Sequence, residues 1–202
     1  MILASVVLVA AVSVVRADDC APPKPGDKMT PPWECCKLTD SDFVMPQVIE
    51  KAMKKCSEKN PLPKPPSPGD MKGGPSTELK NALSCAAECM FSEAKMLTAD
   101  KMLDKDAIIR VFTSISKEDK NWGPVIPKVV EKCLASNSDE IDKSLECKSG
   151  AKELEQCLMR ESFLGCPENA WNDQASCKEL KNKVSKCPSI PIMLLKPNMK
   201  VN

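Results

Sequence analysis

Cysteine is the residue type in this chain whose side chain most readily forms covalent bonds or binds a metal. The chain has 202 residues, with twelve cysteines and no histidine. Cys85 and Cys89 stand four positions apart in a segment, 77–92, whose apolar residues recur at helical spacing. On a helix, two such thiols share one face and point outward side by side, so they cannot bond to each other. Each must reach a different segment, and we therefore expect this helix to organise a disulfide-stapled chain.

The absence of histidine narrows the possible reactions. No imidazole is available as a base or as a metal ligand, and no G-x-S-x-G or phosphate-binding glycine loop is present. The paired carboxylates Asp104 and Asp106, like Asp139 and Glu140, are better explained as helix caps and surface charge. Without histidine or a C-x-x-C pair, a zinc site is not expected. We predict that the chain is not an enzyme and carries neither a metal nor a cofactor.

The first residues predict export from the cell. Residues 1–17 form an apolar run that ends in the small-x-small pattern Val15-Arg16-Ala17, which is typical of a signal peptide. A membrane anchor is the poorer alternative, because spanning requires about 20 apolar residues. Loss of Arg16 brings the formal charge from +1 to zero, which argues against nucleic acid and against a polybasic membrane patch. In an oxidising compartment, twelve cysteines predict six disulfides.

The rest of the pattern predicts an all-α fold. Proline-rich sequence without periodicity makes 18–39 an extended arm and 60–75 a loop. Elsewhere, apolar residues at helical spacing follow capping side chains. Helices are expected from Asp40 or Asp42 to about Cys56, over 77–92, after Thr98 and after Asp104 or Asp106, from Pro124 through Leu134, and over 150–164 and 176–187. We predict one domain at 18–202, a disulfide-stapled bundle of about six to eight short helices, with 167–202 as a C-terminal extension.

Our hypothesis is that this bundle encloses an internal hydrophobic cavity. A chain of this length can bury enough apolar surface to fold without bridges, so the bridges could hold a shell whose centre is not fully packed. The eleven methionines suit a pocket that accepts several shapes, although each could also be plain core. The apolar residues expected to face a ligand are Met90, Phe91, Met102, Ile108, Phe112, Val129, Leu158 and Phe163.

The C-terminal tail is unusually apolar. Ile190, Ile192, Met193, Leu194 and Leu195 form a run with prolines on either side. Such a run is rarely left in water. It could be ordinary packing, a lid over a cavity, or a subunit contact in a homodimer, and the pattern does not choose among these.

The order and spacing of the cysteines point to one family. The features are Cys85-x3-Cys89, Cys157-x8-Cys166, Cys56 before them and Cys133 between them, together with adjacent Cys35 and Cys36, an extra Cys147, the Cys166-Pro167 dipeptide, and Cys177 and Cys187 beyond it. This pattern resembles the insect odorant-binding proteins and, within them, the Plus-C subgroup. The resemblance covers nearly all of the mature chain.

The resemblance implies a disulfide framework. Carried over, it would pair Cys56 with Cys89, Cys85 with Cys157, and Cys133 with Cys166. Three more bridges would then form among Cys20, Cys35, Cys36, Cys147, Cys177 and Cys187. Cys177 and Cys187 should not join each other, because they lie about 15 Å apart on a helix. At least one of Cys35 and Cys36 is expected to hold the C-terminal extension.

The resemblance also implies a function. It is that of a secreted carrier that binds small hydrophobic odorants or pheromones and moves them through sensillar lymph to olfactory receptors. The alternatives are a secreted disulfide-rich structural or interaction protein and a carrier of non-olfactory lipids. Some relatives are thought to release ligand when histidines protonate. Because this chain has none, acid release would need carboxylates, for instance one paired with a lysine that holds a lid.

Overall fold

The computed structural model describes residue 20 and residues 30–37, 47–61, 63, 75–117, 119–136, 141–188, 190, 192 and 194. The predicted signal peptide at 1–17 lies outside these residues. In the described part the regular elements are α1 (Pro32–Cys35), α2 (Gln47–Lys59), α3 (Thr77–Glu93), α4 (Lys105–Ser116), α5 (Ile126–Ser136), α6 (Ala151–Leu164), the 3-10 helix η4 (Glu168–Ala170) and α7 (Ala175–Lys186). The prediction of an all-α fold is confirmed.

Local sequence explains where the long helices begin. The hydroxyl of Ser76 accepts a hydrogen bond from the Leu79 N–H, and the carboxylate of Asp104 accepts one from the Ala107 N–H. These caps satisfy N–H groups that have no partner inside the helix. The structure therefore selects Asp104 over Asp106 as the cap of α4. The predicted start of α2 at Asp40 or Asp42 lies outside the described residues.

Thr98 does not begin a helix, which corrects one prediction. Its hydroxyl accepts a hydrogen bond from the Met102 N–H across a tight turn, and Leu97 and Leu103 form an antiparallel bridge on either side of it. The segment 94–104 is therefore a small hairpin between α3 and α4. Its tight turn is reflected in Lys101, which adopts a φ of 58°.

The expected extended arm contains the short helix α1. Pro32 occupies its first turn, where the fixed φ of proline suits a helix start. Beyond it, Cys36 forms an antiparallel bridge with Trp171. The Lys37 N–H donates to the Ala170 carbonyl at 3.0 Å, and the Asn172 N–H donates to the Cys35 carbonyl at 2.8 Å. The arm is thus hydrogen-bonded to the C-terminal extension.

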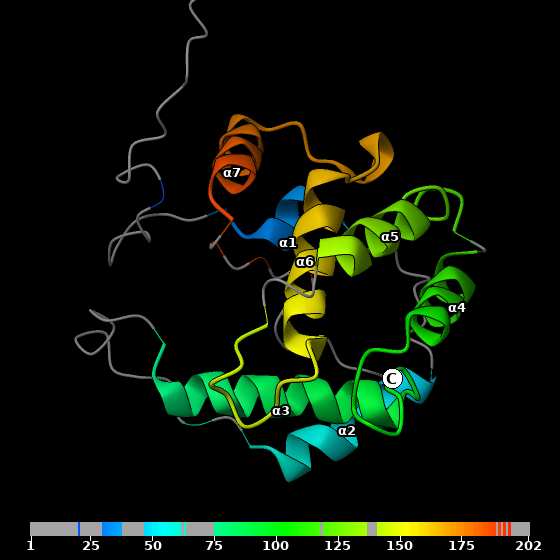
Figure 1. Ribbon diagram of the computed structural model, residues 1–202. Helices are drawn as coiled ribbons and strands as arrows, with labels where there is room; N and C mark the ends of the chain where they lie inside the picture. Colours follow the sequence, from blue (N-terminus) through cyan, green and yellow to red (C-terminus); the bar gives the residue numbers. More distant parts are fainter. Residues whose placement is uncertain are drawn as a thin grey trace, which may run out of the picture.

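Helix α6 stands at the centre of the fold (Figure 1). It contacts α3, α5 and α7, while α2 packs against α3 and α4 packs against α5. Figure 1 shows α3 crossing the first turns of α6 and α7 lying near its other end. This arrangement gives α6 two separate apolar neighbourhoods along its length.

The first cluster is the larger of these neighbourhoods. Its buried residues are Ala87, Phe91, Ala94, Met96, Ile108, Val129, Val130, Cys133, Leu134, Ala151, Leu154 and Leu158. They come from α3, the hairpin 94–104, α4, α5 and α6. Burial of this apolar surface is the main force that holds these elements together.

The second cluster joins the two ends of the described chain. Its buried residues are Cys35, Cys36, Trp122, Phe163, Cys177, Val184 and Leu194. Ile190 and Ile192 pack against it. The described part of the apolar tail is therefore packed as core, while Met193 and Leu195 lie outside the described residues.

Six disulfides connect the described residues. They are Cys20–Cys187, Cys35–Cys177, Cys36–Cys166, Cys56–Cys89, Cys85–Cys147 and Cys133–Cys157. Cys85 and Cys89 do reach different segments, and Cys56 is the partner expected for Cys89. Cys35 holds the C-terminal extension through Cys177, as expected.

Two pairings implied by the resemblance are wrong. Cys85 bonds to Cys147 and not to Cys157, because α3 crosses the first turns of α6, and Cys157 lies six residues, or about 9 Å, after the start of that helix. The segment before α6 runs beside α3 instead. There the Glu146 N–H donates to the side-chain oxygen of Asn81.

The second wrong pairing is Cys133 with Cys166. Helices α5 and α6 pack side by side, and Cys133 meets Cys157 across them. The Lys132 ammonium and the Glu161 carboxylate form an ion pair across the same two helices at 2.6 Å. Cys166 lies beyond the end of α6, where the second cluster begins, and bonds to Cys36. Three more bridges were expected among Cys20, Cys35, Cys36, Cys147, Cys177 and Cys187. Two of the observed bridges lie within that set, Cys20–Cys187 and Cys35–Cys177, whereas Cys36 and Cys147 bond to Cys166 and Cys85.

Peptide mapping of the oxidised protein tests this framework. Trypsin can cleave after Lys143, Lys148 and Lys152, and so separates Cys133, Cys147 and Cys157; a protease specific for glutamate can cleave after Glu88 and so separates Cys85 from Cys89. Mass spectrometry of the unreduced digest should find Cys85 linked to Cys147 and Cys133 linked to Cys157. A peptide linking Cys85 to Cys157 would contradict the structure.

Replacing both Cys85 and Cys147 with serine should lower the free energy of unfolding by about 2–4 kcal/mol.

Candidate functional site

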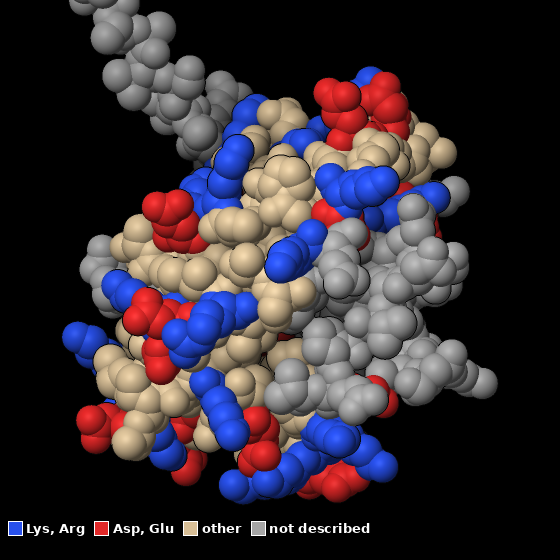
Figure 2. All heavy atoms as spheres, turned by 90° about the vertical axis from the view of Figure 1, so that its right-hand side faces the viewer, with Lys and Arg blue, Asp and Glu red and all other residues tan. Residues whose placement is uncertain are grey.

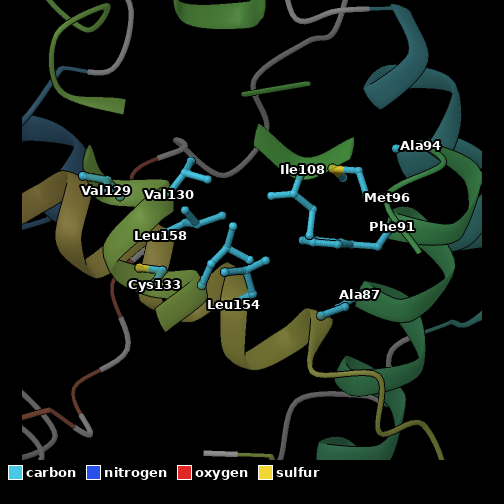
Figure 3. Close-up of a cluster of buried hydrophobic side chains, with 12 residues drawn as sticks. Ala87, Phe91, Ala94, Met96, Ile108, Val129, Val130, Cys133, Leu154 and Leu158 are labelled. Carbon is cyan, nitrogen blue, oxygen red and sulfur yellow. The ribbon is translucent and has the colours of Figure 1, made fainter. Parts of the chain in front are cut away.

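The first cluster brings together most of the residues expected to face a ligand. Phe91, Ile108, Val129 and Leu158 are buried in it, and half-buried Phe112 packs against it. They come from α3, α4, α5 and α6. Figure 3 shows Phe91, Ile108 and Leu154 directed toward one another from three of these helices. Side chains far apart in sequence thus share one apolar interior.

Three expected residues do not belong to this cluster. Met102 is 55% exposed, because it precedes Leu103 in the extended arm of the hairpin, where successive side chains point to opposite faces. Phe163 lies in the second cluster, since five residues after Leu158 the helix has turned about 140°. Met90 is only half-buried and lies outside both clusters.

Sequence reasoning also missed residues that the first cluster contains. Leu154 is fully buried and Met96 nearly so. Leu154 stands four positions before Leu158, so helical spacing alone could have added it. Met96 gave no such signal, because it lies in the hairpin and its burial depends on tertiary packing.

The buried side chains of the first cluster are hydrocarbon or sulfur-containing, and none can act as an acid, base or free nucleophile, because Cys133 is in a disulfide. Such a surface can hold a small molecule by shape and apolar burial. The expected internal cavity stays a prediction.

Two polar side chains interrupt the buried face of α3 beside Phe91. Ser84 is 3% exposed, and its hydroxyl has no hydrogen-bond partner among the described residues. Glu88, one turn further along, is 8% exposed. A buried carboxylate needs a compensating partner, and Glu88 has Lys101, whose ammonium lies 3.1 Å from its Oε1.

The ion pair Glu88–Lys101 holds the hairpin against α3. Lys101 adopts a φ of 58°, a left-handed conformation that is uncommon for side chains larger than glycine. Beneath it, Leu97 and Leu103 pack against the first cluster. The hairpin is thus attached by one ion pair at its tip and by apolar contacts at its base.

Glu88→Gln tests this attachment. Amide exchange in the hairpin, measured by mass spectrometry, should accelerate because the tip loses its charge pair while the base stays packed. The matched control is Asp173→Asn, which removes the exposed pair between Lys178 and Asp173. Exposed pairs contribute only about 0.2–1 kcal/mol, so the control should leave hairpin exchange unchanged. Equal exchange in Glu88→Gln and the unaltered protein would contradict the role of the pair.

A second carboxylate, that of half-buried Glu155, lies at the edge of the buried side of α6. Burial raises the pKa of Glu155 above its ordinary value of 4.5. Glu155 forms no hydrogen bond or ion pair with the described residues, so nothing there offsets the cost of burying its charge. This differs from Glu88, which has a lysine partner.

Glu155→Gln should therefore stabilise the protein near neutral pH. Below pH 4.5 the group is neutral in the folded and unfolded states and costs nothing; as pH rises through the raised folded pKa, burial of the charge removes stability. Thermal unfolding at pH 7 should show the variant a few degrees higher, since 1 kcal/mol corresponds to about 2–4 °C in a chain of this size. At pH 4 the difference should shrink. A variant less stable than the unaltered protein at pH 7 would contradict this expectation.

The outer surface carries both signs of charge. Figure 2 shows Lys and Arg side chains interspersed with Asp and Glu over the face it displays. The face therefore lacks the single-sign field that attracts polyanions. Among the described residues, no helix has both the length and the apolar character needed to cross a membrane.

Comparison with known proteins identifies the family. Residues 42–161 match the model of the PBP/GOBP family, which is more than half of the chain. The chain therefore belongs to the PBP/GOBP family. General odorant-binding protein 67 of Anopheles gambiae is 28% identical over 160 residues, which cover 76% of this chain and 72% of that protein. The twelve cysteines, joined in six bridges, fit a Plus-C-type pattern.

The range that matches the family, residues 42–161, contains the first cluster but little of the second. Every buried residue of the first cluster lies within 42–161. In the second cluster only Trp122 does, and Cys35, Cys36, Phe163, Cys177, Val184 and Leu194 lie outside. The first cluster is thus the interior that belongs to the family match, and the second joins the two extensions to Trp122 and to Phe163 of α6.

Proposed function

We propose that this protein is a secreted carrier that binds small hydrophobic odorants or pheromones and transports them through sensillar lymph to olfactory receptors. The observation that carries the proposal is the family match over residues 42–161. Membership in a family of odorant-binding carriers also argues against an enzymatic role. The signal-peptide pattern at 1–17 supports secretion.

The first cluster is the proposed site of ligand binding. It lies wholly inside the matched range, and it contains four of the expected contacts, with Phe112 packed against it. Its walls come from four helices and the hairpin, so a ligand there would be surrounded by side chains. The contribution of the protein would be burial of the ligand, with no bond made or broken.

A binding assay tests the proposal. The oxidised mature protein should bind a neutral hydrophobic fluorescent probe saturably, and small odorants should displace it. Absence of saturable binding would favour the alternative of a disulfide-rich structural or interaction protein. Displacement by non-olfactory lipids together with expression only outside sensory tissue would favour the other alternative, a non-olfactory carrier.

A matched pair of variants locates the ligand. Phe91 and Phe163 were both expected contacts and are both buried, but they lie in different clusters. Phe91→Leu should weaken probe binding about fivefold, because it removes ring contacts worth about 1 kcal/mol at the proposed site. Phe163→Leu removes the same group from the second cluster and should leave affinity within about twofold. The reverse result would move the site to the second cluster.

A further inference from the structure

The two hydrophobic clusters meet at the start of α5. Val125 and Ile126 are half-buried there and pack against both the first and the second cluster. Among the described residues, no other side chain is common to the two clusters. We call these two residues the boundary pair. The interior in which the ligand is proposed to lie therefore ends at this pair, and the second cluster begins on its other side.

Backbone hydrogen bonds fix the position of the boundary pair. The Asp119 carboxylate accepts hydrogen bonds from the N–H groups of Asn121 and Trp122, at 2.8 and 2.9 Å. The carbonyl of Trp122 accepts in turn from the N–H groups of Val125 and Ile126, both at 2.9 Å. Trp122 is itself buried in the second cluster. The boundary pair is therefore held in place before any ligand binds.

Gly165 supports Val125 from the end of α6. A methyl group on Gly165 would lie 3.5 Å from Cγ1 of Val125 and 3.1 Å from the carbonyl oxygen of Glu161. The φ of Gly165 is −91°, which other residues adopt freely, so the missing side chain matters here for space. The disulfide Cys133–Cys157 also holds α5 to α6. Val125 is thus packed closely against the end of α6.

The polar and apolar ends of the proposed site lie at opposite ends of α6. Helix α3, which carries Glu88 beside Phe91, crosses the first turns of α6 (Figure 1). The boundary pair lies beside Gly165, after the last turn of this 14-residue helix, about 21 Å along its axis. Figure 3 shows Phe91 at one side of the first cluster and Val129 of α5 at the other. A ligand with one polar end would therefore direct its hydrocarbon end toward α5.

We propose that the boundary pair forms the closed end of the ligand site and sets the length of the hydrocarbon chain that the site accepts. The class of ligand is a linear aliphatic molecule with one polar end, such as a fatty alcohol. A chain that reaches Val125 and Ile126 goes no further, because the second cluster is packed on their other side. This inference rests on the proposed carrier function and adds to it a basis for selecting among ligands.

The test measures how octan-1-ol, decan-1-ol, dodecan-1-ol and tetradecan-1-ol displace the fluorescent probe. In the unaltered protein, affinity should rise with chain length to an optimum and then fall. Val125→Ala shortens one side chain of the boundary pair and should move the optimum to a longer alcohol. The affinity for the alcohol just beyond the original optimum should rise about fourfold, which is the gain from burying one further methylene.

Three further variants control for position and folding. Val111→Ala makes the same change in a half-buried valine of α4 that packs against the first cluster alone, and it should leave the optimum in place. Ile126→Val shortens the other residue of the boundary pair and should move the optimum in the same direction as Val125→Ala. Adding Gly165→Ala to Val125→Ala places a methyl group beside the vacated space and should restore the original optimum. Circular dichroism verifies that each variant is folded.

The outcomes separate this inference from the proposed function. An unchanged optimum in both Val125→Ala and Ile126→Val, or an equal shift in Val111→Ala, overturns the boundary pair as the closed end of the site. If affinity in the unaltered protein rises through the whole series, the length limit is wrong while the carrier function stands. If neither the alcohols nor the probe bind, the carrier function fails and this inference fails with it.

Discussion

The packing of α6 between two hydrophobic clusters is the interaction on which the rest of the structure depends. Leu154 and Leu158 anchor one side of this helix in the first cluster, and Phe163 anchors its last turn in the second. Phe163 also meets Trp171 edge to face, with ring centroids 5.6 Å apart, and Lys181 lies over the same indole ring. Removal of α6 would therefore expose both apolar interiors to water, and neither could persist alone.

The six disulfides of the described residues form two groups, one around each cluster. Cys56–Cys89, Cys85–Cys147 and Cys133–Cys157 connect elements that surround the first cluster. The other three bridges join the N-terminal segment to the region after α6 and surround the second cluster. The extensions are thus a second stapled layer on the family domain, and they share α6 with it.

The buried and half-buried polar groups of α3 and α6 differ in whether they have a partner. Glu88 is paired with a lysine of the hairpin, whereas Glu155 and the hydroxyl of Ser84 have no partner among the described residues. An unpaired polar group in an apolar setting lowers stability. The hydroxyl of Ser84 is such a group, and Ser84 lies on the same face of α3 as Ala87 and Phe91 of the first cluster.

The sequence by itself determined the long helices, the even set of cysteines and the family, because helical periodicity, capping residues and cysteine spacing are local properties. Asp104 begins α4, as one of the two cap residues expected there. Only the tertiary structure decided which thiols meet: Cys157 faces α5, and Cys147 faces α3, because of the height at which α3 crosses α6. It likewise placed Met102 in water and Phe163 in the other cluster. Crossing angles and the direction of each helix face arise from packing between distant segments, and no local pattern encodes them.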